Sequence, residues 1–396
     1  MKVLYVSHTS LVSGAERSLL GLLETLPADV EPCLAVPPGP LYDHAVALGI
    51  PTVPIPSVVG SLKLHPVYTA TALRAMARAS LSLFREARRM QPDLIHANSV
   101  RPALIAVPVA RALRRPVLLI VRDCLPPSAL TSRLQALLVG HSEGVIAISR
   151  HVAEVFDPEA RASRLIVSDD TFDLTAFDPT SFERDAARAR LGIAPGTPVL
   201  VLVGQITPWK GQEEAIRALA AVRRAHPSAT LLIVGEAKFV SRATRYDNVA
   251  YLGRLQELAR ELQLEDAVRF LGEQSPIGEV LRAGDVSLVP SWEEPFGRVV
   301  VEAMAMGLPV VATSAGGPAE LIDDGVDGVL VAPRRPDALA AAITRLLDDP
   351  DLRGRIGVAA RRAAVVRFGD KNRHASEVTA LYREVLAQRR SYAAAA

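Results

Sequence analysis

Short apolar runs alternate along this chain with longer segments of helical periodicity, and that alternation most narrows the folds open to it. The pattern is expected of parallel β-sheets flanked by helices. We expect a first set of strands at 2–7, 31–36, 52–55, 93–97, 116–121 and 144–148, and a second set at 198–203, 230–234, 267–270, 286–289, 309–312 and 328–331. The predicted fold class is α/β, with two Rossmann-like, doubly wound halves.

The length of 396 residues also favours two domains, since a single hydrophobic core rarely keeps growing to that size. A charged helical segment and a Leu-Gly-Ile-Ala-Pro-Gly-Thr stretch lie between the two sets of strands, within 181–197. We therefore predict domains at 1–185 and 186–367, with a further helix in 368–396. In parallel sheets ligands bind beyond the carboxyl ends of the strands, so a cleft between the domains is the expected active site.

Charge and cysteine content exclude several classes of protein. The formal net charge of +2 does not suggest nucleic acid as a partner, and two cysteines provide no disulfide framework. The first residues resemble a strand rather than a signal peptide, and no apolar stretch reaches the roughly 18 residues needed to span a bilayer. A cytoplasmic protein is the expectation.

The most informative motif is Ser-Trp-Glu-Glu-Pro-Phe-Gly-Arg-Val-Val-Val-Glu, at 291–302. Pro295 suits a first helical turn, so Glu294 is predicted at the mouth of a helix and Glu302 about two turns inside it. The N–H groups of a helix N-terminus favour an anion such as a diphosphate, and carboxylates accept hydrogen bonds from sugar hydroxyls. A nucleotide sugar combines these groups.

This segment resembles the Glu-x7-Glu signature of the retaining glycosyltransferases of the glycogen-synthase-like superfamily, family four, which have the GT-B fold. The resemblance covers nearly the whole chain. It implies two Rossmann-like domains facing a cleft, with the helix in 368–396 crossing back to the first domain. It assigns the donor sugar hydroxyls to Glu294 and the ribose to Glu302. The residues between them, Phe296, Gly297, Arg298 and Val299, would meet the sugar and the diphosphate.

A second motif, 204–211, is similar to the family's Gly-Arg-x…Lys-Gly loop, which holds the donor diphosphate. Gly204 and Lys210 match the motif, and Lys210 would neutralise charge that develops on the leaving diphosphate. Gln205 stands where the family has arginine, so another cation is expected to compensate or the phosphate is held less tightly. Arg298 and Lys238 are the nearest candidates.

Other donor residues follow from the same resemblance. Gly235 ends a buried strand where backbone can approach a ligand closely, and Arg269 and Phe270 occupy the segment whose backbone frames the nucleobase. Further along, Gly317 and Glu320 fit phosphate contact or simple capping of a helix that starts at Pro318.

In the first half, Ser13-Gly14-Ala15-Glu16 resembles the family's Gly-Gly-x-Glu loop, with serine in place of the first glycine. Gly14 would approach the donor phosphate, whereas His8 and Glu16 would face the acceptor. A capping box, with serine at the N-cap and glutamate three residues later, is the purely structural interpretation.

Two more strand ends carry acceptor candidates. His96 and Asn98 end one predicted strand, although His96 also fits a buried core histidine. The next strand ends in Arg122 and Asp123 where many family members have a His-Asp pair. Asp123 is the catalytic candidate there, and Arg122 would bind an anionic acceptor or supply the charge that Gln205 lacks. The adjacent acidic residues at 169–170 are interpreted as a loop rather than a metal site.

Residues 61–90 interleave Lys63 and several arginines with Leu, Met and Phe. A basic amphipathic helix can lie on an anionic membrane, but the same spacing is expected of a helix packed on the first sheet with one polar face outward. A lipid-linked acceptor is therefore possible without being indicated.

The function that these features favour is a retaining, metal-independent glycosyltransferase. It would use a nucleotide-diphosphate sugar, such as a UDP or GDP sugar, a hydroxyl acceptor and no cofactor. Two alternatives share the architecture: a non-hydrolysing nucleotide-sugar epimerase and a nucleotide-sugar-binding protein without turnover. Release of nucleoside diphosphate that depends on an added acceptor distinguishes them.

Overall fold

The computed structural model describes residues 1–58, 66–238 and 246–395 and divides the chain into two compact units. Unit 1 comprises Met1–Phe172 with Asp370–Ala396, and unit 2 comprises Asp173–Gly369. The division falls before the boundary predicted at 185–186. The reason is that η1 (Leu174–Phe177) packs on α11 and α7 (Arg184–Arg190) packs on α10, both in unit 2. The Arg184 guanidinium also bonds to the carbonyl of Gly284 at 2.7 Å.

Unit 1 contains a seven-stranded parallel sheet in the order β3-β2-β1-β4-β5-β6-β7. Its strands are β1 Lys2–Val6, β2 Glu31–Val36, β3 Thr52–Pro54, β4 Leu94–Ala97, β5 Val117–Val121, β6 Gly144–Ala147 and β7 Leu165–Val167. The sequence predicts all but β7, a strand of three residues, none of them fully buried. The strand order reverses between β1 and β4, as in a doubly wound fold.

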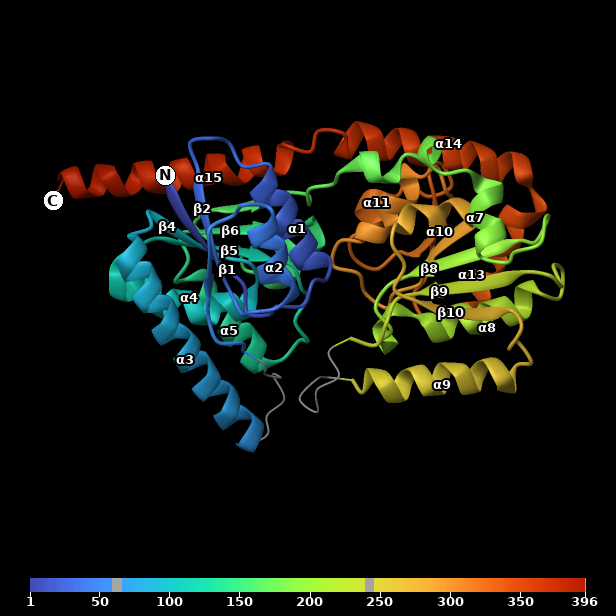
Figure 1. Ribbon diagram of the computed structural model, residues 1–396, viewed down its shortest axis with the longest axis horizontal. Helices are drawn as coiled ribbons and strands as arrows, with labels where there is room; N and C mark the ends of the chain where they lie inside the picture. The colour runs from blue at the N-terminus through green and yellow to red at the C-terminus, as the bar shows by residue number, and fades with distance from the viewer. Residues whose placement is uncertain (59–65, 239–245, 396) are drawn as a thin grey trace. The chain divides into compact units, whose positions relative to one another are not determined.

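Helices of unit 1 cover both faces of this sheet (Figure 1). They are α1 Gly14–Glu24, α2 Pro40–Ala47, α3 Pro66–Met90, α4 Val100–Leu113, α5 Ala129–Val139, α6 Arg150–Phe156 and α15 Arg373–Ala395. The chain thus returns to unit 1 in α15, where Tyr382 is fully buried and its hydroxyl bonds to His96 Nδ1 at 2.6 Å.

Unit 2 repeats the arrangement with six parallel strands in the order β10-β9-β8-β11-β12-β13. The strands are β8 Val199–Val203, β9 Thr230–Val234, β10 Val268–Gly272, β11 Val286–Val289, β12 Val310–Thr313 and β13 Val329–Val331. The longer helices are α8 Gln212–Val222, α9 Asn248–Glu261, α10 Ile277–Ala283, α11 Arg298–Ala305, α13 Pro336–Asp348 and α14 Pro350–Phe368, with a short α12 at Pro318–Leu321. The predicted α/β class with two Rossmann-like halves is confirmed.

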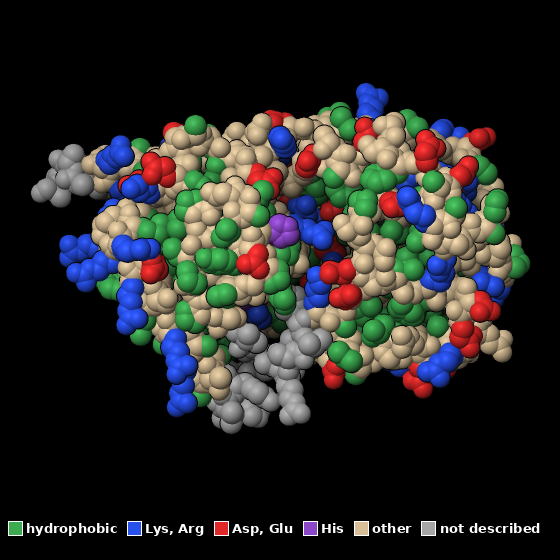
Figure 2. Space-filling view, viewed as in Figure 1, with side chains coloured by type: hydrophobic (Ala, Val, Ile, Leu, Met, Phe, Trp, Pro, Cys, Tyr) green, Lys and Arg blue, Asp and Glu red, His purple; other side chains and the backbone are tan. Residues whose placement is uncertain are grey.

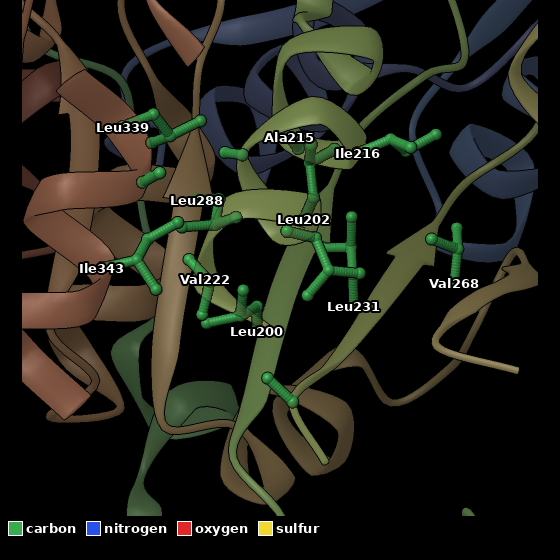
Figure 3. Packing of buried hydrophobic residues seen from close by; sticks show 14 of the residues in the cluster. Leu200, Leu202, Ala215, Ile216, Val222, Leu231, Val268, Leu288, Leu339 and Ile343 are labelled. Atoms are coloured by element: carbon green, nitrogen blue, oxygen red, sulfur yellow. The ribbon is translucent and has the colours of Figure 1, made fainter. Parts of the chain in front are cut away.

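One hydrophobic cluster holds the sheet of unit 2 to α8 and α13 (Figure 3). Leu200 and Leu231 project from neighbouring strands and pack with Ile216 of α8 and Ile343 of α13, all fully buried. Because burying a Leu or Ile side chain contributes about 1.5–3 kcal/mol, this cluster fixes the strands firmly. The loops at their carboxyl ends therefore start from a rigid base.

Among the described residues, none of the helices has both the length and the apolar character that crossing a bilayer requires.

Candidate active site

Two predicted site residues meet at the point where the strand order of unit 2 reverses. Lys210 lies in the loop after β8 and Glu294 in the loop after the adjacent β11, and Lys210 Nζ is 2.6 Å from Glu294 Oε2. The Ser291 hydroxyl donates to the same carboxylate oxygen at 2.8 Å. A reversal of strand order is where doubly wound sheets bind ligands, so this pair marks the candidate donor site.

The backbone explains how the two loops come so close. Gly211 follows Lys210 with φ of 74°, and a Cβ built there would lie 2.1 Å from the carbonyl oxygen of Pro290 in the other loop. Only glycine fits this contact without moving one of the loops. Nearby, the Trp292 N–H donates to the Trp209 carbonyl at 2.8 Å, which ties the loops together.

The helix α11 starts later than the sequence predicts. It begins at Arg298, with Gly297 as N-cap at φ of 104°, so Pro295 precedes the helix and Glu302 lies about one turn inside it rather than two. No side chain caps this end. The Phe296 ring is buried and packs edge-on against Phe368, so Phe296 can face a ligand only through its backbone.

Inside α11, Glu302 is buried with 5% of its surface exposed. The nearest cation is Arg298, whose Nε lies 3.9 Å from Glu302 Oε1, too far for a hydrogen bond. A buried carboxylate with so weak a partner is costly unless a ligand also bonds to it. Val299, the remaining predicted residue of this segment, is half-buried in the first turn of the helix.

A third loop, after β12, completes the arrangement. The Thr313 hydroxyl donates to the Ser291 carbonyl at 2.6 Å, and the Glu294 carbonyl accepts from the Gly317 N–H at 2.8 Å. Gly317 caps α12, as expected, and its missing Cβ would lie 2.1 Å from the carbonyl oxygen of Phe296. The sequence analysis assigns no role to Ser291 or Thr313, although their place at the ends of adjacent strands is a signal that could have identified them.

The Gln205 side chain is engaged by backbone, since its Nε2 donates to the Lys238 carbonyl at 3.1 Å. The Lys238 ammonium pairs with Glu273, so it carries no unbalanced charge. Gly235 has φ of 137°, and a Cβ there would lie 2.0 Å from the carbonyl oxygen of Gly204. This glycine therefore permits close packing of the β8 and β9 ends, whether or not it contacts a ligand.

The side chains of Arg269 and Phe270 are engaged within unit 2. The Arg269 guanidinium donates to the Leu191 carbonyl, and the Phe270 ring packs against the hydrophobic cluster of unit 2. Both side chains thus make their contacts within unit 2. Only the backbone of this segment is left to frame a nucleobase.

In unit 1, His8 and Gly14 flank the loop after β1. Arg101 Nη1 lies 3.5 Å from His8 Nε2, and burial together with this guanidinium lowers the pKa of His8 to about 3. Gly14 is the first residue of α1, and the Ser13 N–H donates to Glu16 Oε2 at 3.1 Å. The capping box is thus present, and it occupies the carboxylate that was predicted to face the acceptor.

Arg122 does not offer a free charge to an anionic acceptor, contrary to that prediction. It is 5% exposed, its Nη1 donates to Asp170 Oδ1, and its Nε donates to Asn98 Oδ1 at 3.3 Å. Asn98 is buried by the same contact. Asp170 therefore neutralises a buried arginine, while Asp169 pairs with Arg373 of α15 at 3.0 Å, and the sequence spacing predicts neither partner. Asp123, the next residue, is exposed.

His96 is likewise a core residue rather than an acceptor contact. It is fully buried between Tyr5 and Tyr382, with ring centroids 5.1 Å and 5.9 Å from its own. Burial is the main reason that its pKa falls to about 3. A neutral, enclosed imidazole cannot touch a substrate in this conformation.

Two family profiles match the chain. "Glycosyltransferase Family 4" matches residues 12–166, and "Glycosyl transferases group 1" matches residues 183–363. A glycogen synthase of Mycobacterium tuberculosis is 31% identical over 319 residues, which are 76% of this chain and 72% of that protein. The chain therefore belongs to glycosyltransferase family 4.

A D-inositol 3-phosphate glycosyltransferase of Nocardia farcinica is 38% identical over 216 residues, which are 54% of this chain. The match spans only about half, 46%, of that relative's length.

Solved structures show the GT-B fold over the full chain. Anabaena HepE, crystallised in complex with UDP-glucose, superposes with a TM-score of 0.81 at 27% identity, covering 96% of this chain and 99% of HepE. Sucrose-phosphate synthase from Thermosynechococcus elongatus shares the fold with a TM-score of 0.79 at 21% identity, covering 98% and 99%.

Proposed function

We propose that this chain is a retaining glycosyltransferase that moves a sugar from a nucleotide-diphosphate sugar to a hydroxyl acceptor. The observation that carries the proposal is the Lys210–Glu294 pair, held at the reversal of strand order beside the uncapped N-terminus of α11. A cation and helix N–H groups suit a diphosphate, and a carboxylate suits sugar hydroxyls. Because HepE was crystallised with UDP-glucose, a UDP sugar is the first donor to test.

The reaction assigns one task to each group. The bond between the sugar C1 and the diphosphate oxygen breaks, the bond between C1 and the acceptor oxygen forms, and the acceptor proton passes to the leaving phosphate oxygen. Lys210 and the N–H groups of α11 stabilise the growing negative charge, Glu294 orients the sugar and Glu302 holds the ribose. From unit 1, Gly14, His8 and Asp123 remain proposed contacts of donor phosphate and acceptor.

Metal independence belongs to the same proposal. The positive charge that a divalent cation would bring to a diphosphate would come here from Lys210, in the segment after β8, and from Arg298, the first residue of α11. Turnover is expected to persist in excess EDTA. Loss of turnover on chelation and recovery with Mg²⁺ or Mn²⁺ would contradict this part.

The decisive experiment has two stages. UDP-, GDP-, ADP- and dTDP-sugars are first compared for their effect on the thermal unfolding temperature, since a ligand of the folded state raises it. Release of nucleoside diphosphate from the best donor is then measured with and without acceptors, including D-inositol 3-phosphate and glucans. The anomeric configuration of the product, read by NMR, tests retention. Diphosphate release that ignores the acceptor, or stabilisation without release, would overturn the proposal.

A further inference from the structure

Helix α3 packs through one narrow stripe and leaves its opposite side uncovered. Ala72, Ala79, Leu83 and Ala87 are buried, at the spacing of one helix face, and α3 contacts α4. The prediction of a packed surface helix thus accounts for these residues. Packing on α4 does not account for the side chains on the exposed side of α3.

Four arginines follow one another along the exposed side of α3, and we name them the α3 arginine row: Arg74, Arg78, Arg85 and Arg88. Steps of four, seven and three residues keep them on one face over about 20 Å, at 1.5 Å per residue. Among the described residues none of the four has an acidic partner, because the one glutamate of this helix, Glu86, pairs with Arg89 at 2.8 Å. Figure 2 shows Lys and Arg side chains gathered over the part of the molecule where Figure 1 places α3.

Exposed leucines accompany the row. Leu81 lies within it at 59% exposure, and Leu73 lies beside it at 61%. In the same layer of helices, α5 exposes Leu130 and Leu137 with Arg133 between them. Large aliphatic side chains so exposed bury little of their surface within the chain, so a partner that removed them from water would gain binding energy.

We propose that the α3 arginine row and its leucines form a docking surface for an anionic lipid bilayer. Arginines on one helix face match a plane of lipid phosphates, and exposed leucines among them can enter the acyl boundary. A nucleic acid would satisfy the arginines but not the leucines. The proposal does not depend on the sugar chemistry of unit 2, because the row lies in unit 1. The full chain carries a net charge of only +2, so the row concentrates positive charge locally.

The test is sedimentation of the full chain with vesicles of phosphatidylcholine alone or with about 30 mol% phosphatidylglycerol, at low and physiological salt. The first variant changes Arg74, Arg78, Arg85 and Arg88 to Gln, and a second changes Leu81→Gln. A matched control removes the same charge from exposed arginines of unit 2, namely Arg260, Arg345, Arg355 and Arg362.

Wild type and the control are expected to bind the anionic vesicles and not the neutral ones. The row variant should bind at least ten-fold more weakly, since each arginine near such a surface is worth about five-fold, and Leu81→Gln should lose several-fold. An equal loss in the control would show that net charge alone acts. Binding of single-stranded DNA through the row without vesicle binding, or no vesicle binding by wild type, would also overturn the proposal.

Discussion

Lys210 Nζ lies 2.6 Å from Glu294 Oε2, although 84 residues separate them in the sequence. The same ammonium sits 4.2 Å from the centroid of the Trp209 ring, and the carboxylate also accepts from Ser291. Contacts within the protein thus hold the pair in place. A donor diphosphate would replace Glu294 as the anion facing Lys210, and the freed carboxylate oxygen would then be available for a sugar hydroxyl.

The first prediction concerns Lys210→Ala. The catalytic rate should fall by about 100-fold or more while donor affinity changes less, because the charge opposite Lys210 is larger in the transition state than in the ground state. Steady-state kinetics with the best donor and acceptor measure both effects. Lys371→Ala, at an exposed position, is the control, and a normal rate for Lys210→Ala would remove Lys210 from the mechanism.

The second prediction concerns Glu302→Gln. This nearly isosteric change removes a buried charge and should weaken the donor sugar and the free nucleoside diphosphate alike, by about 1–3 kcal/mol, because both carry the ribose. Isothermal titration of the two ligands gives the comparison. The exposed Glu257→Gln serves as control. If the folded variant bound both ligands as wild type does, the ribose assignment would be wrong.

The sequence predicts the α/β class and nearly every strand, because apolar runs of this length report burial directly. The proximity of Lys210 and Glu294 can also be predicted from the sequence, because both residues follow strands whose carboxyl ends share one edge of a sheet. What the sequence could not reveal were pairings set by side-chain direction. Asp170 lies close in space to Arg122 because it follows β7, a strand that the sequence analysis does not predict.

Dependence on a distant side chain also explains why the sequence does not settle the role of His96. A histidine at the end of a strand fits a ligand contact or a core position, and which applies depends on Tyr382, which arrives from α15 at the other end of the chain. The start of α11 was misjudged for a local reason. Pro295 is compatible with a first turn, but the positive φ of Gly297 sets the cap two residues later.

The third prediction is a pH dependence of the stability of unit 1. Burial lowers the pKa of His96 to about 3 and that of His374 to about 4, from a usual value near 6.5. The unfolded chain therefore binds more protons between these values. Stability should decrease as the pH falls below about 6.5, by about 1.4 kcal/mol per pH unit for each histidine, until the pKa of the folded state is reached.

Native-state hydrogen exchange of the β4 amides, followed between pH 7 and pH 5, measures this slope. His374→Gln should reduce it, because one buried group then no longer titrates, while the exposed His44→Gln should not change it. His96 lies against Tyr5, Tyr382 and Arg122. The groups around His374 are Ser168, 2.7 Å from its Nδ1, and the charged Asp169, Asp170, Arg122 and Arg373. A slope that is the same in all three proteins would contradict the prediction.

The last prediction concerns Gln205, the clearest departure from the family motif. Since Arg122 is neutralised by Asp170 and Lys238 by Glu273, Arg298 is the candidate that compensates for the missing guanidinium. It begins α11, its side chain is largely buried, and its Nε lies 3.9 Å from Glu302. With that charge in place, Gln205→Arg adds like-charge repulsion and should weaken UDP binding several-fold.

The double variant provides the discriminating comparison. Relative to Arg298→Ala alone, adding Gln205→Arg should tighten UDP binding, because a single guanidinium can again chelate the phosphate oxygens. Gln205→Met separates loss of the bond to the Lys238 carbonyl from the effect of charge. Calorimetric titration of UDP into the wild type and the four variants decides the question. Tighter binding by the single Gln205→Arg variant would mean that the site lacks a compensating cation and that the phosphate is held more weakly than in the rest of the family.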